Sequence, residues 1–213
     1  MINGSDIFVY HKYWERELIS RHILIPTLYY PHCSYSVDVQ YCERKGILFV
    51  GEYEFERAES LAMLSQNNED VRIFGPGWSR AQCMKHNFAK TVKIRSGFLG
   101  REKYFEIASQ SLICLNFFRQ KVKDRLTDRP IELITRGCCV VSEYSTEIER
   151  LFKDQHEIVL FRNNKELLEA VDRIKEMPKE SYSIGKNGMA LVQAKKLSTV
   201  TLAKYICEIC TKL

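Results

Sequence analysis

The chain has 213 residues, of which 45% are hydrophobic and 28% are charged, and its formal net charge is +5. This is the composition of a globular protein that can bury a core, and the mild positive charge suits a phosphate-bearing small ligand at least as well as a nucleic acid. No apolar run approaches the roughly 18 residues needed to span a bilayer, and the polar residues 3–6 argue against a secretory segment.

Residues 1–45 are expected to form a partial βαβ segment followed by a linker. Residues 6–11 and 22–30 have the apolar content of short strands, with a helical pattern between them. Residues 31–45 are polar and rich in turn formers, which is typical of a domain boundary. We therefore expect a second, larger unit over residues 46–213.

In this larger unit, apolar strands alternate with helical segments. The predicted strands are residues 46–51, 70–75, 91–95, 111–117, 138–143 and 157–161. The predicted helices are residues 54–67, 101–110, 130–137, 145–152, 164–177, 181–196 and 199–213. This alternation predicts an α/β fold, a Rossmann-like parallel sheet with right-handed crossovers and helices on both faces.

Eight cysteines occur in the chain, and several of them lie in apolar runs. Cys114, Cys138 and Cys139 are expected to be buried and reduced, because cysteine behaves there as a small hydrophobic residue. Cys207 and Cys210 have CxxC spacing, but no second pair and no paired histidines accompany them, so we expect no metal. Together with the absence of a secretory segment, these features predict a cytoplasmic protein.

The first βα junction of the larger unit is suited to a phosphate. Strand 46–51 ends at Gly51, where a glycine allows a sharp turn and a close approach of a ligand. Arg57 follows and could reach the same crevice, which in an open parallel sheet lies beyond the carboxyl ends of the strands. An ordinary βα turn explains Gly51 equally well.

A later junction begins the helix that contains Pro130. Proline favours the first helical turn, with Thr127 or Asp128 as the capping residue. Arg129 would then lie beside the positive end of the helix, where the dipole does not favour a cation. We therefore expect Arg129 to point at an anion, or at Asp124 or Asp128.

Glu132 lies one turn further into the same helix. A carboxylate at this place can accept hydrogen bonds from the vicinal hydroxyls of a ribose. Without other observations, a structural role explains it as well, so both interpretations stay open.

Four segments form an ordered set of motifs. They read "ILFVGEYEFERAESLAML", "VRIFGPGW", "CLNFFRQKVKDRLTDRPIELITRGCCVVSE" and "LFKDQHEIVLFRNNKELLEAV". Together they resemble the C-terminal half of GT-B glycosyltransferases over residues 46 to 205, in particular the CgeB-like group of glycosyl transferase family 1 domains. The resemblance implies a Rossmann-like domain that binds a nucleotide-diphosphate sugar, with a UDP-sugar as donor, and a transfer of the sugar to a hydroxyl acceptor.

The resemblance also implies roles for single residues. Gly51 and Arg57 match the phosphate-side turn, and Glu132 matches the glutamate that holds the ribose. Arg129 matches the arginine before that helix. Arg57, Arg129 and a helix N-terminus could stabilise the leaving diphosphate without a metal or other cofactor, and no Asp-x-Asp motif suggests Mg²⁺.

Two positions depart from the family pattern. Asp124 stands where many retaining relatives have a glutamate, so it keeps the charge with a shorter side chain; we retain it, with Arg129, as a candidate catalytic residue. The usual glycine pair before the next helix is replaced, and here Ser145 and Thr146 could donate hydroxyls to the diphosphate. Nothing in the pattern places His11, His32, His86 or His156 as a general base.

A GT-B enzyme has two Rossmann-like domains, and residues 6–30 resemble only the tail of the first. Three arrangements stay open: the chain is a truncation, a partner chain supplies the first domain, or the protein binds a donor without transferring the sugar. The last describes a non-catalytic nucleotide-binding or protein-interaction module. A nucleic acid is the least favoured partner, because Tyr104, Phe117 and Phe118 are expected in the core.

Overall fold

The computed structural model describes residues 7–9, 27–29, 43–67, 70–119 and 125–195. Strands β1 (Ile7–Val9) and β2 (Thr27–Tyr29) form a two-stranded parallel sheet that is separate from the main sheet. The prediction that residues 6–30 lie outside the main sheet is therefore confirmed for these strands. The helix expected between them and the predicted last helix lie outside the described residues.

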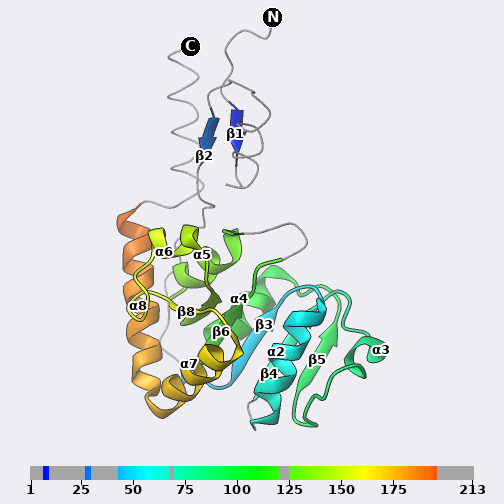
Figure 1. Cartoon of the computed structure of the whole chain (residues 1–213). Helices are drawn as coiled ribbons and strands as arrows, with labels where there is room; N and C mark the ends of the chain where they lie inside the picture. The colour runs from blue at the N-terminus through cyan, green and yellow to red at the C-terminus, as the bar shows by residue number, and fades with distance from the viewer. Residues whose placement is uncertain (1–6, 10–26, 30–42, 68–69, 120–124, 196–213) are drawn as a thin grey trace, which may run out of the picture.

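The larger unit is built on a six-stranded sheet in the order β5-β4-β3-β6-β7-β8 (Figure 1). Its strands are β3 (Ile47–Val50), β4 (Val71–Gly75), β5 (Lys93–Ser96), β6 (Ile113–Asn116), β7 (Val140–Glu143) and β8 (Val159–Phe161). Every neighbouring pair is parallel. The order is that of the dinucleotide-binding Rossmann fold, which confirms the predicted fold class and places β3 at the centre of the sheet.

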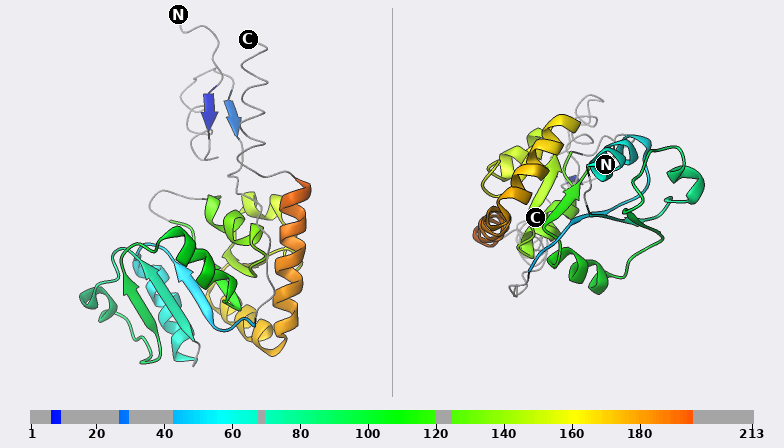
Figure 2. Two further views of the ribbon diagram at one scale, coloured as in Figure 1. Left: turned by 180° about the vertical axis from the view of Figure 1, so that it is seen from behind. Right: turned by 90° about the horizontal axis from the view of Figure 1, so that it is seen from below.

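Helices cover both faces of the sheet (Figures 1 and 2). On one face lie α2 (Phe55–Gln66) and α7 (Asn164–Glu176), and on the other lie α4 (Arg101–Ser109), α5 (Asp128–Thr135) and α6 (Thr146–Leu151). The side chains of β3 alternate between the two layers: Ile47 and Phe49 pack with α2 and α7, whereas Leu48 packs with α4 and α5. This burial on both faces explains the continuous apolar runs of the central strands.

Strand β5 is largely exposed and, like the other strands, lies within about two residues of its predicted bounds. One element differs from the sequence prediction. The short helix α3 (Arg80–Cys83) was not predicted, since a single turn is too short to show a period; it begins after Ser79, whose hydroxyl accepts the N–H of Gln82 at 3.3 Å.

Helix α8 (Pro178–Ala194) packs against α5 and α7 and begins three residues before its predicted start. A Cβ atom at Gly185 would lie 2.1 Å from the carbonyl oxygen of Gly137. The helix backbone therefore rests directly on the backbone that leads into β7. None of the helices in the described ranges is long and apolar enough to cross a membrane.

Arg44 joins this packing from the end of the predicted linker. Its guanidinium donates to the Gly137 carbonyl at 2.7 Å and lies 4.8 Å from the centre of the Tyr182 ring. Its backbone N–H donates to the Tyr182 hydroxyl at 3.1 Å. The last residues of segment 31–45 are therefore part of the packing of the larger unit.

We predict that Gly185→Ala lowers the free energy of unfolding by about 1–3 kcal/mol, the range for overpacked sites. The new methyl group would press on the Gly137 carbonyl, although alanine is the better helix former by up to about 1 kcal/mol. Urea unfolding measures the change, with Lys186→Ala, at the exposed next position, as the matched control. Equal stability of Gly185→Ala and the parent would contradict the close packing of α8.

Candidate functional site

A cavity of about 590 Å³ lies beyond the carboxyl ends of β3, β4 and β6. The first turns of α4 and α5 complete its walls. The chain leaves β3 toward the face covered by α2 and leaves β6 toward the face covered by α5, so the cavity lies at the topological switch point of the sheet. Its volume is within the range of small-molecule sites, about 300–1,000 Å³.

The cavity brings together residues from both predicted βα junctions. Four of the predicted site residues line it: Gly51, Arg57, Arg129 and Glu132. Asp124 lies outside the described residues.

Ser145 and Thr146 are not among the described residues that line the cavity. The Ser145 side chain is buried and caps α6, accepting the N–H of Ile148 at 3.2 Å and donating to the Arg125 carbonyl. The Thr146 hydroxyl donates to the Glu147 carboxylate at 2.9 Å. Both hydroxyls thus have partners within the fold.

Gly51 leaves room for the Phe49 ring and does not make an unusual backbone turn. A Cβ atom on Gly51 would lie 2.6 Å from the Phe49 ring, and Gly51 is not among the residues with positive φ. Its carbonyl accepts the indole N–H of Trp78 at 2.8 Å. A Cβ atom on Gly75, which has a φ of +143°, would lie 2.0 Å from the same carbonyl oxygen, so only glycine fits there.

Arg57 is buried with Glu54, and the two side chains form an ion pair at 3.2 Å. Its guanidinium also donates to the carbonyl of Glu52 at 3.2 Å and to that of Phe117 at 3.4 Å. Arg57 therefore ties the β3–α2 turn to the end of β6 and holds this wall of the cavity in place.

Asp128 was one of the partners expected for Arg129 from the sequence, but the Arg129 side chain points elsewhere. Its guanidinium donates to the carbonyl of Val50 at the end of β3 and lies 5.3 Å from the centre of the Tyr104 ring. Helix α5 starts at Asp128, two residues before Pro130, and Thr127 precedes it without a side-chain capping bond. The cation therefore lies inside the cavity, between the sheet and α4.

Glu132 is partly buried, with 22% of its side chain exposed, and its carboxylate lies 3.8 Å from the guanidinium of Arg101. Burial is the main cause that raises the pKa of Glu132, and Asp128 adds repulsion. Arg129, Arg101 and Arg136 act in the opposite direction and favour the ionised carboxylate. An acceptor held between cations in this way can bind hydroxyl donors.

Helix α4 supplies site residues that the sequence reasoning missed. Arg101, Tyr104 and Phe105 line the cavity from its first turns, and the exposed Phe98 lies before them. The sequence did contain a signal for these residues, the β5–α4 junction "SGFLGREKY". This junction opens at the same edge of the sheet as the junctions that hold Gly51 and Arg129. Arg119, after β6, also lines the cavity.

The histidines in the described segments make contacts outside the cavity lining. His86 Nε2 lies 2.9 Å from the Tyr53 hydroxyl, and His156 is 3.8 Å from the Glu157 carboxylate. Among the described residues there is no group of three His, Cys, Asp or Glu side chains suited to a metal ion. These parts of the chain therefore provide neither a histidine base at the cavity nor a metal centre.

The cysteine prediction is confirmed for Cys114, Cys138 and Cys139, which are buried free thiols. A hydrogen bond between Cys114 and Cys138 raises the pKa of the first thiol and lowers that of the second. Cys207 and Cys210 lie outside the described residues. Cys114 and Cys138 belong to the core on the α4–α5 face of the sheet, and Cys139 belongs to the core on the α2–α7 face.

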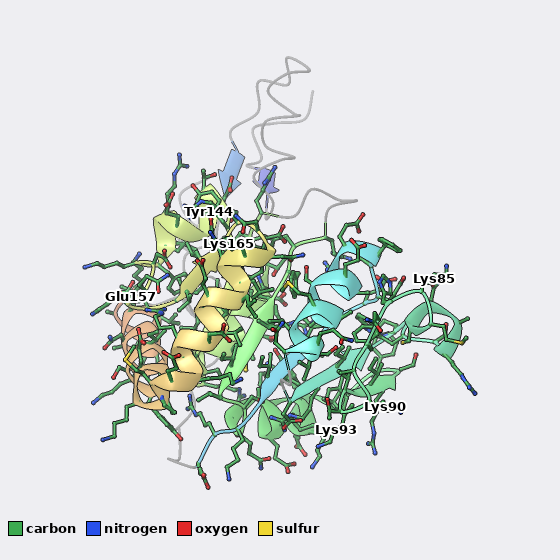
Figure 3. All side chains as sticks on the ribbon, turned by 60° about the horizontal axis from the view of Figure 1, so that its bottom comes forward. Lys85, Lys90, Lys93, Tyr144, Glu157 and Lys165 are labelled. Atoms are coloured by element: carbon green, nitrogen blue, oxygen red, sulfur yellow. The ribbon has the colours of Figure 1, made fainter. Side chains whose placement is uncertain are left out.

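The described residues give little support to a nucleic-acid interface. Tyr104 and Phe118 are buried in the core, as predicted, and Phe117 packs against it. Figure 3 shows Lys85, Lys90 and Lys93 near α3 and β5, whereas Lys165 lies on α7, so these four lysines do not gather in one patch.

A parallel sheet of this strand order with a ligand-sized cavity at its switch point defines a Rossmann-like domain. Residues 56–207, more than two thirds of the chain, match the family described as glycosyl transferase-like. The chain belongs to this glycosyltransferase family. No curated protein sequence matches the chain.

Solved structures share the fold at low identity. HepE of Anabaena, in complex with UDP-glucose, aligns with a TM-score of 0.73 at 12% identity, covering 98% of this chain and 64% of that chain. Sucrose-phosphate synthase of Thermosynechococcus elongatus gives 0.70 at 16% identity, covering 99% and 58%. The C-terminal domain of the glycosyl transferase group 1 family protein LpcC of Francisella tularensis gives 0.55 at 12%, covering 72% and 87%. The chain therefore spans less than two thirds of the first two proteins.

The Tyr104 hydroxyl is buried without a hydrogen-bond partner among the described residues. We predict that Tyr104→Phe raises the free energy of unfolding by about 1 kcal/mol, because it removes this unpaired polar group and keeps the ring. Tyr104→Ala should lower it by about 3–5 kcal/mol, since the packed ring is lost. Urea unfolding measures both changes. A less stable Tyr104→Phe variant would show that the hydroxyl is paired.

Proposed function

We propose that residues 46–213 form the donor-binding domain of a GT-B glycosyltransferase, which binds a nucleotide-diphosphate sugar and transfers the sugar to a hydroxyl acceptor. The observation that carries the proposal is the cavity at the switch point, where Gly51, Arg129 and Glu132 meet. The family match and the shared fold with a UDP-glucose complex support the same conclusion.

In this proposal each side of the cavity binds one part of the donor. Glu132 accepts hydrogen bonds from two ribose hydroxyls. Arg129 and the N-terminal turn of α5 face the diphosphate, and the hydrogen bond to Val50 uses only one of the five N–H donors of the guanidinium. As the sugar departs, charge grows on the diphosphate, and these fixed positive groups stabilise it.

Arg57 would contribute to the phosphate side through the wall that it holds. Ser145 and Thr146, at the start of α6, and Asp124 are further candidates from the family resemblance for contacts with the diphosphate and the donor sugar. Within this proposal Arg129 and Asp124 are the candidate catalytic residues, and neither a metal nor another cofactor is assigned a role.

The resemblance narrows the proposal further. We assign the chain to the CgeB-like group, with a UDP-sugar as donor, residues 6–30 to the tail of a first domain and residues 31–45 to a linker. The buried free thiols support a reducing compartment, and we place the reaction in the cytoplasm. A first domain or a partner chain would complete the acceptor site.

A second candidate function is a non-catalytic nucleotide-binding or protein-interaction module derived from a glycosyltransferase. Such a module would bind the nucleotide sugar and transfer nothing. Hydrolysis or transfer of UDP-glucose by the purified chain separates an active enzyme from such a binding module.

We predict that Glu132→Gln weakens UDP binding about ten- to hundredfold. The amide keeps the shape of the side chain but loses the charged acceptor, and hydrogen bonds to charged groups contribute about 1.5–3 kcal/mol. Isothermal titration calorimetry measures the dissociation constant, and Glu169→Gln on the exposed side of α7 is the control. Unchanged affinity in a folded Glu132→Gln variant would refute the ribose role.

For Arg129→Ala we predict a loss of at least about tenfold in affinity for UDP but only a small loss for uridine, because the lost partner is the phosphate. Calorimetry with both ligands measures the difference. Arg150→Ala, an exposed arginine of α6, controls for the loss of one positive charge, and circular dichroism confirms folding. Equal losses for UDP and uridine would assign Arg129 to the fold instead of the phosphate.

A further inference from the structure

The wall between α4 and α5 is built from stacked arginines and aromatic rings. Arg136 lies 3.5 Å and Arg101 lies 5.6 Å from the centre of the Phe105 ring. Arg101 also reaches the carboxylate of Glu132 at 3.8 Å, from the opposite helix. Both partners of this ion pair line the cavity.

Arg101 occupies an unfavourable place for a cation. It is the first residue of α4, where the helix dipole favours a negative charge. A residue that breaks such a local rule commonly serves a site, and here the Glu132 carboxylate and the Phe105 ring supply its compensating contacts.

We propose that Arg101 is a positioning residue of the donor site, which holds the Glu132 carboxylate ionised and directed across the cavity. This inference rests on the proposed function of Glu132 as the ribose acceptor. It assigns to α4 a role in nucleoside binding that acts through Glu132 and needs no contact between Arg101 and the nucleotide.

The charges around Glu132 explain why such a residue is needed. Burial and the neighbouring Asp128 raise the pKa of Glu132, while Arg129, Arg101 and Arg136 counteract them. Arg129 is also bonded to Val50, and Arg136 is stacked on Phe105. Among the described residues, Tyr104 of α4 is a further titratable neighbour of Glu132, and burial raises the pKa of Tyr104.

The exposure of the two side chains determines how strongly Arg101 affects the pKa of Glu132. Glu132 is 22% exposed and Arg101 is 60% exposed, so the pair is partly solvated and its contribution is moderate. Glu132 accepts ribose hydroxyls fully only while it is ionised, so nucleotide affinity falls as the pH drops through its pKa. Without Arg101 that pKa rises further, and the fall begins at a higher pH.

The test compares Arg101→Gln with the control Lys103→Gln. The control removes one positive charge from the same helix, but Lys103 pairs with Glu106, at 2.8 Å, and not with Glu132. Carboxyl ¹³C NMR of the ligand-free protein, assigned with Glu132→Gln, should show a higher Glu132 pKa in Arg101→Gln and the parent value in Lys103→Gln. UDP affinity of Arg101→Gln should be about two- to fivefold weaker at neutral pH, with its loss on acidification shifted to higher pH. Arg101→Lys keeps the positive charge and should therefore restore part of the parent's Glu132 pKa and part of its UDP affinity.

The outcomes separate this inference from the proposed function. If Glu132→Gln weakens UDP binding but Arg101→Gln keeps the parent's pH profile and Glu132 pKa, the positioning role of Arg101 is overturned alone. If the parent does not bind UDP, or Glu132→Gln binds it unchanged, the proposed function fails, and with it the role of Arg101 in nucleoside binding.

Discussion

The site depends on the parallel pairing of β3 with β6 at the centre of the sheet. The pairing joins Ile47 to Ile113 and Phe49 to Leu115, although the two strands are separated in the chain by three helices and two other strands. Because the chain leaves these neighbouring strands toward opposite faces, their connections diverge and leave a cavity between them. The cavity therefore follows from the strand order of the sheet and not from particular side chains.

Close backbone contacts preserve this geometry. Gly75 allows the end of β4 to pass the Gly51 carbonyl, and the buried pair of Arg57 and Glu54 fastens the next turn to the end of β6. Removing one partner of a buried ion pair leaves an uncompensated charge, so such a pair makes the turn intolerant of change. The side of the cavity assigned to the phosphates is thus held in place by contacts within the protein, which are present without a ligand.

The sequence was informative where burial or topology produces a local pattern. All six predicted strands lie in the sheet within about two residues of their predicted bounds. For five of them the signal is the burial of both faces, whereas β5 is largely exposed. Gly51, Arg57 and Glu132 were found because the carboxyl edge of a parallel sheet is a predictable location. The partners of Arg129 were not, since Val50 lies 79 residues away and becomes a neighbour only after folding. For the same reason the pairing of Arg101 with Glu132 could not be read from the sequence, although the β5–α4 junction opens at the same edge of the sheet.

The arginines of the cavity already have partners in the free protein, and this bears on how a ligand would bind. Arg129 is held by Val50 and Tyr104, and Arg101 by Glu132 and Phe105. A flexible arginine would lose rotamer freedom on binding an anion, at a cost of about 0.5–1.5 kcal/mol for each immobilised side chain. Stacking on α4 reduces that loss before the ligand arrives, and a guanidinium retains further donors after one hydrogen bond. The rings of Tyr104 and Phe105, which look like ordinary core residues, thereby become the support that keeps the charges of the site in place.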